Sequence, residues 1–248
     1  MKEKIYMIPV NDAYRSTAAC PLCSLAKNIE QNSLDYYLGP SLMEPDVRIS
    51  TNTTGFCGEH LEKLYQREIN RLGLGLMLHT HLKDLWKDVG EDLSKAAPAP
   101  GSFFKGRDKD YKKNLEALAD KMERRADACI ICQKKDDTMR RYVDVLLWMF
   151  FEDRDFRAVF MTKKNHCLHH TAVLLRGAAT YLSQNQAAEF VAALATLQEE
   201  GTQKLISDVE WFTLKFDYKN KDKPWGDSKT AIPRTIDFLS GEGGLSDG

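Results

Sequence analysis

Four short motifs decide how this chain folds. Residues 20–23 read CPLC, residues 57–60 read CGEH, residues 129–132 read CIIC and residues 167–170 read CLHH. Together they use all six cysteines of the 248 residues. A CxxC turn directs two thiolates at one ion, and a CxxH turn directs a thiolate and an imidazole. The same pair of motifs, present twice, therefore predicts two metal sites of the Cys3His type.

The spacing of the motifs indicates an internal repeat. The two CxxC motifs stand 109 positions apart and the two CxxH motifs 110 positions apart, so one inserted residue brings the halves into register. This register matches His60 with His170. It leaves His166 and His169 without a counterpart in the first half, and we interpret these two as core or solvated side chains.

The predicted ligand sets pair each CxxC motif with the CxxH motif that follows it. The first set is Cys20, Cys23, Cys57 and His60, and the second set is Cys129, Cys132, Cys167 and His170. Four soft ligands close a tetrahedral shell, which is typical of structural zinc, so we predict two zinc ions per chain. An iron–sulfur cluster is an alternative, because thiolate-rich ligation also suits iron.

The same ligand sets disfavour metal hydrolase chemistry, because a catalytic zinc usually keeps an open position for water. A thiol-redox enzyme or sensor that uses the CxxC motifs is the alternative function, although no thioredoxin-like strand–helix–strand pattern surrounds these motifs. Glu199 and Glu200 fit a solvated helix face, and residues 152–155 fit a loop or cap. We therefore assign no catalytic residue.

Composition limits the classes of partner. Lys and Arg number 35 and Asp and Glu number 36, so the net charge of −1 does not support binding to nucleic acid or an anionic membrane. No stretch reaches the ~18 uncharged apolar residues of a membrane span, and we expect a cytoplasmic protein. In that reducing compartment CxxC pairs are more often metal ligands than disulfides. The function that best fits is a metal-stabilised interaction or regulatory module with a protein partner.

Helical spacing of apolar residues dominates the chain. It predicts helices over residues 24–39, 59–97 and 184–215, and the run 143–151 is apolar almost all round, which predicts a buried helix. Few segments alternate with the period of a strand. We therefore predict an all-α bundle of two metal-clamped helical hairpins, a long C-terminal helix and an irregular tail.

The predicted modules follow the repeat. Residues 1–95 form the first CxxC/CxxH module, residues 96–108 a linker rich in Pro and Gly, and residues 109–215 the second module, packed with the first as one unit. Residues 216–248 form the tail, in which Trp225 is an apolar anchor. We expect this tail to be either a strap on the protein's own helices or a docking segment for a partner.

The order CPxC, FCxxH, CxxC and CxxH, followed by a tail that reads FDYKNKDKPWGDSKTAIPRTI at residues 216–236, resembles a bacterial protein family of unknown function. The resemblance spans nearly the whole chain. The chain departs from the family pattern at the second CxxH motif, which reads CLHH at residues 167–170. The family implies no activity, so the resemblance supports the metal-binding interpretation only.

Overall fold

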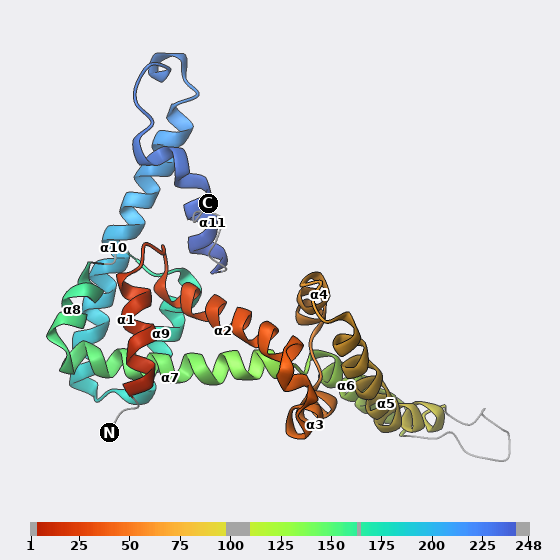
Figure 1. The fold of residues 1–248 in the computed structure, drawn as a ribbon. Coiled ribbons are helices and arrows are strands. Elements are labelled where there is room, and N and C mark those ends of the chain that lie inside the picture. Colours follow the sequence, from red (N-terminus) through yellow and green to blue (C-terminus); the bar gives the residue numbers. More distant parts are fainter. Residues whose placement is uncertain (1–3, 98–109, 163–164, 242–248) are drawn as a thin grey trace. The chain divides into compact units, whose positions relative to one another are not determined.

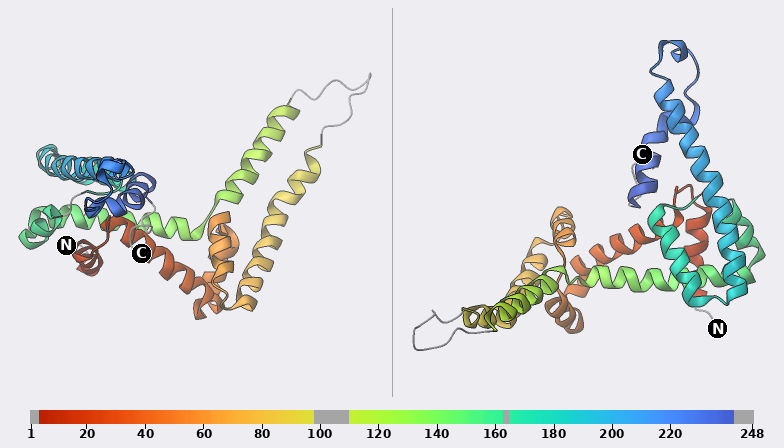
Figure 2. Two further views of the ribbon diagram at one scale, coloured as in Figure 1. Left: turned by 90° about the horizontal axis from the view of Figure 1, so that it is seen from above. Right: turned by 180° about the vertical axis from the view of Figure 1, so that it is seen from behind.

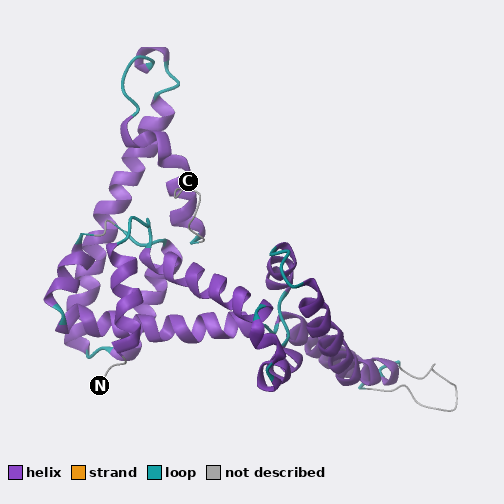
Figure 3. Ribbon diagram, in the orientation of Figure 1, coloured by secondary structure: helices purple, strands orange, loops and turns teal. Residues whose placement is uncertain are grey.

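The structure is a computed structural model that describes residues 4–97, 110–162 and 165–241. In these ranges it contains eleven α-helices, four short 3-10 helices and no strand (Figure 3). The predicted all-α class is therefore confirmed. The predicted linker, residues 96–108, lies almost entirely outside the described ranges. No helix in the described part of the chain is long and apolar enough to cross a membrane.

The helices follow one another along the chain as Figure 1 labels them. The α-helices are α1 Met7–Arg15, α2 Pro21–Leu38, α3 Pro45–Thr54, α4 Gly58–Gln66, α5 Arg71–Lys95, α6 Tyr111–Asp127, α7 Ile130–Glu152, α8 Arg154–Met161, α9 Leu168–Tyr181, α10 Gln184–Leu214 and α11 Ala231–Ser240. The 3-10 helices are η1 Lys4–Tyr6, η2 Pro40–Met43, η3 Tyr218–Asn220 and η4 Gly226–Thr230.

The chain forms two compact units. The first unit contains Met1–Ile29 and Asp136–Gly248, and the second unit contains Glu30–Lys135. The boundaries between them fall inside α2 and inside α7. This division differs from the modules predicted at residues 1–95 and 109–215, because the N-terminal helices build one core with helices from the second half of the chain.

The core of the first unit is aromatic. Tyr14 of α1, Phe150 of α7, Phe160 of α8 and Phe190 of α10 are almost completely buried. Neighbouring rings in this set have centroids 5.1–5.6 Å apart, within the range that favours edge-to-face and offset contacts. The prediction of a buried helix over residues 143–151 is confirmed, since most of these residues belong to this core.

Helix α9 meets α7 at Gly177, where a Cβ atom would overlap Cγ1 of Val143. Gly177→Ala is therefore expected to lower the free energy of unfolding by about 1–3 kcal/mol, because the added carbon must push the two helices apart. Gly75→Ala on α5 is the matched control. A Cβ atom there meets nothing within 4 Å, and removing a helical glycine should stabilise by up to about 1 kcal/mol. Thermal unfolding followed by circular dichroism checks both, and equal shifts would contradict the close crossing.

The C-terminal segment packs on other helices of the first unit. Helix α10 begins with a capping box formed by Ser183 and Gln186 and ends within one residue of the prediction. The tail beyond it, predicted to be irregular, contains α11, which lies against α9 and α10 (Figure 1). Pro233 does not end this helix, because it stands in the first turn, where a missing N–H group costs no intrahelical hydrogen bond. The packing of α11 on α9 and α10 favours the strap interpretation over a docking segment.

A buried carboxylate ties α11 to α10. Asp208 of α10 accepts hydrogen bonds from Lys204 Nζ at 2.6 Å and from Arg234 Nη2 of α11 at 2.8 Å. Burial works to raise the pKa of Asp208, but the hydrogen bonds from these two cations outweigh it and the pKa is lowered. Lys204 also contacts Asp227 at 2.9 Å. Charged groups from α10 and from the tail therefore neutralise one another.

The second unit is built around α5, which packs on α3 and runs beside α6 (Figure 2). The predicted continuous helix over residues 59–97 is wrong, because the chain breaks between α4 and α5. Glu68 and Asn70 have φ angles of 56° and 50° there. Asn70 caps α5 by accepting a hydrogen bond from the N–H of Gly73 at 3.0 Å. The glycines of α5 therefore lie inside the helix and do not interrupt it.

Candidate metal centres

The eight side chains predicted from the sequence come together in two groups of four. Group 1 consists of Cys20, Cys23, Cys167 and His170, and group 2 consists of Cys57, His60, Cys129 and Cys132. Within each group the candidate ligand atoms all lie within 4.8 Å of one another. Group 1 belongs to the first unit and group 2 to the second. All six cysteines are free thiols.

The pairing of the motifs differs from the prediction. The CxxC motif at residues 20–23 meets the CxxH motif at residues 167–170, and the CxxC motif at residues 129–132 meets the CxxH motif at residues 57–60. The predicted pairing of each CxxC with the following CxxH is therefore wrong. Both arrangements give two Cys3His sets, and the register of the repeat is unchanged when the CxxH motifs are exchanged. The spacing argument could not separate them.

All four motifs stand at the start of a helix. The first cysteine of each motif immediately precedes the first helical residue, and the second ligand is the third helical residue. The helices concerned are α2, α4, α7 and α9. Three positions are about one turn, so both ligands of a motif lie at the same end of their helix. The partial positive charge of a helix N-terminus also favours thiolates there.

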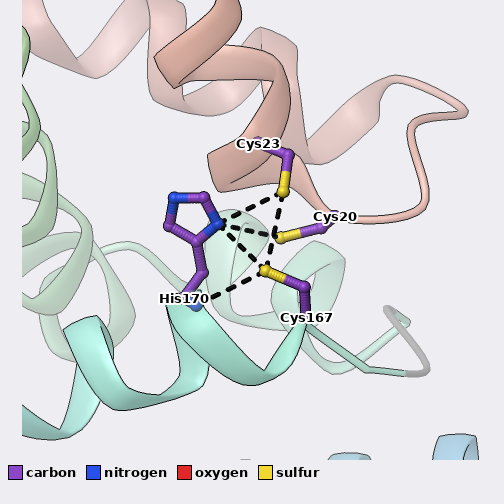
Figure 4. Close-up of side chains that lie close together, drawn as sticks. All are labelled: Cys20, Cys23, Cys167 and His170. Atoms are coloured by element: carbon purple, nitrogen blue, oxygen red, sulfur yellow. Dashed lines mark hydrogen bonds between the residues drawn. The ribbon is translucent and has the colours of Figure 1, made fainter. Parts of the chain in front are cut away.

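In group 1 the imidazole faces all three sulfur atoms (Figure 4). His170 Nδ1 lies 3.7 Å from Cys20 Sγ, 3.2 Å from Cys23 Sγ and 3.1 Å from Cys167 Sγ. The sulfur atoms of Cys23 and Cys167 are 3.6 Å apart. Around one tetrahedral zinc ion, sulfur atoms stand about 3.8 Å from one another and about 3.6 Å from the nitrogen. The four buried side chains of group 1 are close to this geometry.

Group 2 has the same arrangement. His60 Nδ1 lies 3.2 Å from Cys57 Sγ, 3.3 Å from Cys129 Sγ and 3.4 Å from Cys132 Sγ. The sulfur atoms of Cys57 and Cys132 are 3.9 Å apart. These two cysteines are partly exposed, whereas His60 and Cys129 are buried. Group 2 therefore also fits one tetrahedral ion, closer to the surface on its sulfur side.

Protons are unevenly distributed in group 2 before a metal binds. The hydrogen bond with Cys129 raises the pKa of His60 to about 9, against the opposing effect of burial. Burial works to raise the pKa of Cys129, but the hydrogen bond with His60 and backbone hydrogen bonds lower it to about 6. A metal ion needs the thiolate and the neutral imidazole, so its uptake must release protons and a falling pH must oppose it.

In group 1 the cysteines share protons among themselves. Hydrogen bonds with Cys167 and Cys23 lower the pKa of Cys20. The hydrogen bond with Cys167 contributes most to the raised pKa of Cys23. One thiolate therefore forms readily in this group, and the remaining thiol protons are displaced when a cation arrives.

The two other histidines near the second CxxH motif lie outside both groups. His166 is buried in the aromatic core, where its Nε2 atom and the hydroxyl of Tyr14 are 2.7 Å apart. His169 is exposed, and its ring centroid lies 5.0 Å from that of His170. His170, the histidine chosen by repeat register, is the one that belongs to group 1.

Glu30 of α2 is a neighbour of group 2 that the sequence pattern did not single out. Its Oε1 atom lies 3.1 Å from His60 Nε2 and 2.9 Å from Lys63 Nζ. A single glutamate in an amphipathic helix has no distinctive signature. Only the fold brings it to a histidine 30 positions away along the chain.

A cavity of about 310 Å³ borders group 1. Cys20, Cys23 and Cys167 are among the residues that line it, and so are Lys204 and Arg234. The three cysteines of group 1 therefore face this cavity, while the imidazole of His170 is not among the lining groups.

These features define an all-helical protein with two Cys3His groups at helix N-termini. The model of a family of unknown function, DUF6062, matches residues 1–244, and the chain belongs to this family. The resemblance indicated by the motifs and the tail is thereby confirmed. No curated protein matches the chain, and no solved structure does. The function must therefore be argued from the two groups themselves.

Proposed function

We propose that the protein binds two zinc ions per chain, one in each group, and that these ions hold helix N-termini together. The observation that carries this proposal is the pair of complete Cys3His sets, each with its ligand atoms within 4.8 Å of one another. Zinc prefers a tetrahedral shell of thiolates and imidazoles at about these separations. A cluster of several iron and sulfide ions would need its ligands further apart, so the close spacing favours a single ion.

Four protein ligands leave no open position for a substrate, which supports a structural role for the zinc over hydrolysis. The proposal therefore gives the helical scaffold an interaction or regulatory role with a protein partner. Exposed apolar side chains on α5 support this role, among them Leu72, Leu82 and Trp86. Free thiols suit the reducing cytoplasm, where we propose that the protein works.

Zinc content tests both the proposal and the pairing of motifs. Native mass spectrometry and elemental analysis of the purified chain should show two zinc ions. The double variant with Cys20→Ser and Cys167→Ser should keep one ion, because both changes fall in group 1 and group 2 stays complete. Pairing of each CxxC with the next CxxH would instead damage both sites with these two changes.

The matched control carries Cys20→Ser and Cys57→Ser, one change in each group. It lacks the same number of cysteines as the first double variant. It should nevertheless lose both ions, because each group has lost one ligand. One remaining ion in this control would overturn the observed pairing. A folded parent chain without any metal would overturn the proposed function.

A thiol-redox or iron–sulfur role for group 1 is the second candidate. It is favoured by the cavity of about 310 Å³ that Cys20, Cys23 and Cys167 line, since small molecules can approach these sulfur atoms there. Anaerobic purification separates the candidates. A colourless protein with two zinc ions supports the structural role, whereas a brown protein with iron and sulfide, or a zinc-free group 1 with a Cys23–Cys167 disulfide, supports the second candidate.

A further inference from the structure

Glu30 is a carboxylate in an unusual place. It lies on α2 with an exposed fraction of only 9 %, and its neighbours include the buried imidazole of His60. A buried carboxylate is costly unless charged or hydrogen-bonding groups surround it. The groups that contact Glu30 therefore indicate the role of its side chain.

The two ring nitrogens of His60 face different partners. Nδ1 lies 3.2–3.4 Å from the three sulfur atoms of group 2, on the side where a metal would bind. Nε2 lies 3.1 Å from Oε1 of Glu30. A metal-bound Nδ1 requires the proton of a neutral imidazole to be on Nε2, and this proton points at the carboxylate.

We propose that Glu30 is a positioning residue for group 2, which holds His60 in the orientation and tautomer that present Nδ1 to the metal. This proposal rests on the proposed metal-binding function and adds to it. The carboxylate accepts the Nε2–H hydrogen bond and makes the imidazole a stronger ligand, as outer partners of metal-bound histidines do. Lys63 Nζ, 2.9 Å from the same oxygen, holds the carboxylate in place from α4.

Group 1 has no such partner in the described ranges of the chain. His170 presents Nδ1 to the sulfur atoms as His60 does, but no carboxylate contacts its Nε2 atom among the described residues. Its ring instead lies edge-on to that of His169. The two groups thus share a ligand set and differ in what supports the histidine. An effect of Glu30 should therefore appear in group 2 alone.

The test uses the full chain with one group disabled at a time. Cys20→Ser with Cys167→Ser leaves group 2, and Cys57→Ser with Cys132→Ser leaves group 1. Zinc affinity is measured by competition with a chromophoric chelator, and Co²⁺ absorption reports the ligand geometry. Glu30→Gln, which keeps the shape and an accepting oxygen but removes the charge, should weaken group 2 about 10- to 100-fold. Glu30→Met, which also removes the acceptor, should weaken it further and alter the Co²⁺ bands.

Glu59→Gln is the matched control. Glu59 also contacts Lys63, at 2.5 Å, but its side chain has an exposed fraction of 67 %. It should leave zinc affinity unchanged in both groups, and circular dichroism should show parental helix content for every variant.

The outcomes are distinct. Parental affinity of group 2 in Glu30→Gln overturns the positioning role while the proposed function stands. An equal loss in both groups shows that Glu30 acts on the fold as a whole, which also overturns it. A parent chain that binds neither Zn²⁺ nor Co²⁺ overturns the proposed function, and the positioning role with it.

Discussion

Phe150→Ala is expected to lower the free energy of unfolding by about 3–5 kcal/mol. Phe150 is fully buried on α7, with its ring centroid 5.2 Å from that of Phe160 and 5.1 Å from that of Phe190. Its side chain fills the space between three helices. Truncation to alanine leaves a cavity that these rigid neighbours can only partly close, so both transfer and packing energy are lost.

Urea denaturation of the purified chain, followed by circular dichroism, measures this loss. The midpoint should fall while the slope with denaturant stays constant. Tyr218→Ala is the control, because Tyr218 has an exposed fraction of 82 % and its truncation should change stability by less than about 0.5 kcal/mol. A loss below about 1 kcal/mol for Phe150→Ala would contradict a closely packed aromatic core.

Truncation after Lys215 is expected to have the second largest effect. It removes α11, including the buried Ala231, and takes Arg234 away from the buried carboxylate of Asp208. Removing one partner from such a carboxylate is costly, and a total loss on the order of 3 kcal/mol corresponds to a fall of roughly 6–12 °C in melting temperature. Differential scanning calorimetry measures the shift.

Arg234→Met in the full chain separates the contribution of the ionic contact with Asp208 from that of the apolar contacts of α11. It removes the ionic contact with Asp208 but leaves the apolar contacts of α11, so the melting temperature should fall by less than in the truncated chain. An unchanged melting temperature after truncation would contradict the strap. If truncation leaves the melting temperature unchanged but abolishes binding of a partner, the tail is a docking segment. If truncation changes neither stability nor binding, the tail is a linker.

Local patterns predicted much of the fold. The period of apolar residues indicated α10 and the buried part of α7, because helix formation and burial of one face depend on neighbours in sequence. The break before α5 was missed. There, the left-handed conformation of Asn70 depends on a distant contact, since its side chain donates a hydrogen bond to the carbonyl of Leu38 at 2.7 Å. The spacing of apolar residues along the chain does not indicate such a contact between distant residues.

The candidate site shows the same limit. Residue types and repeat register predicted the candidate ligands, including His170 among three histidines, and these side chains meet in the two groups. They did not identify which motifs meet, because both pairings satisfy the same chemistry. Glu30 was missed for a related reason, since its role depends on a contact with His60 that no spacing in the sequence encodes. The sequence therefore indicated the chemistry of the candidate ligands, but it did not indicate which distant residues come into contact.

Because the motifs pair crosswise, the two loops that metal ions in groups 1 and 2 would close are nested. Group 2 joins positions 69–75 residues apart, and group 1 joins positions 144–150 residues apart on either side of it. The second unit, Glu30–Lys135, contains the four residues of group 2 and Glu30, so the inner loop can close while the outer loop is open. Once closed, it shortens the free chain that group 1 must bring together and lowers the entropy cost of that step. During synthesis, moreover, Cys132 completes the inner set before His170 completes the outer one. The topology therefore favours an order of assembly, in which the contiguous second unit closes first and the discontinuous first unit closes last.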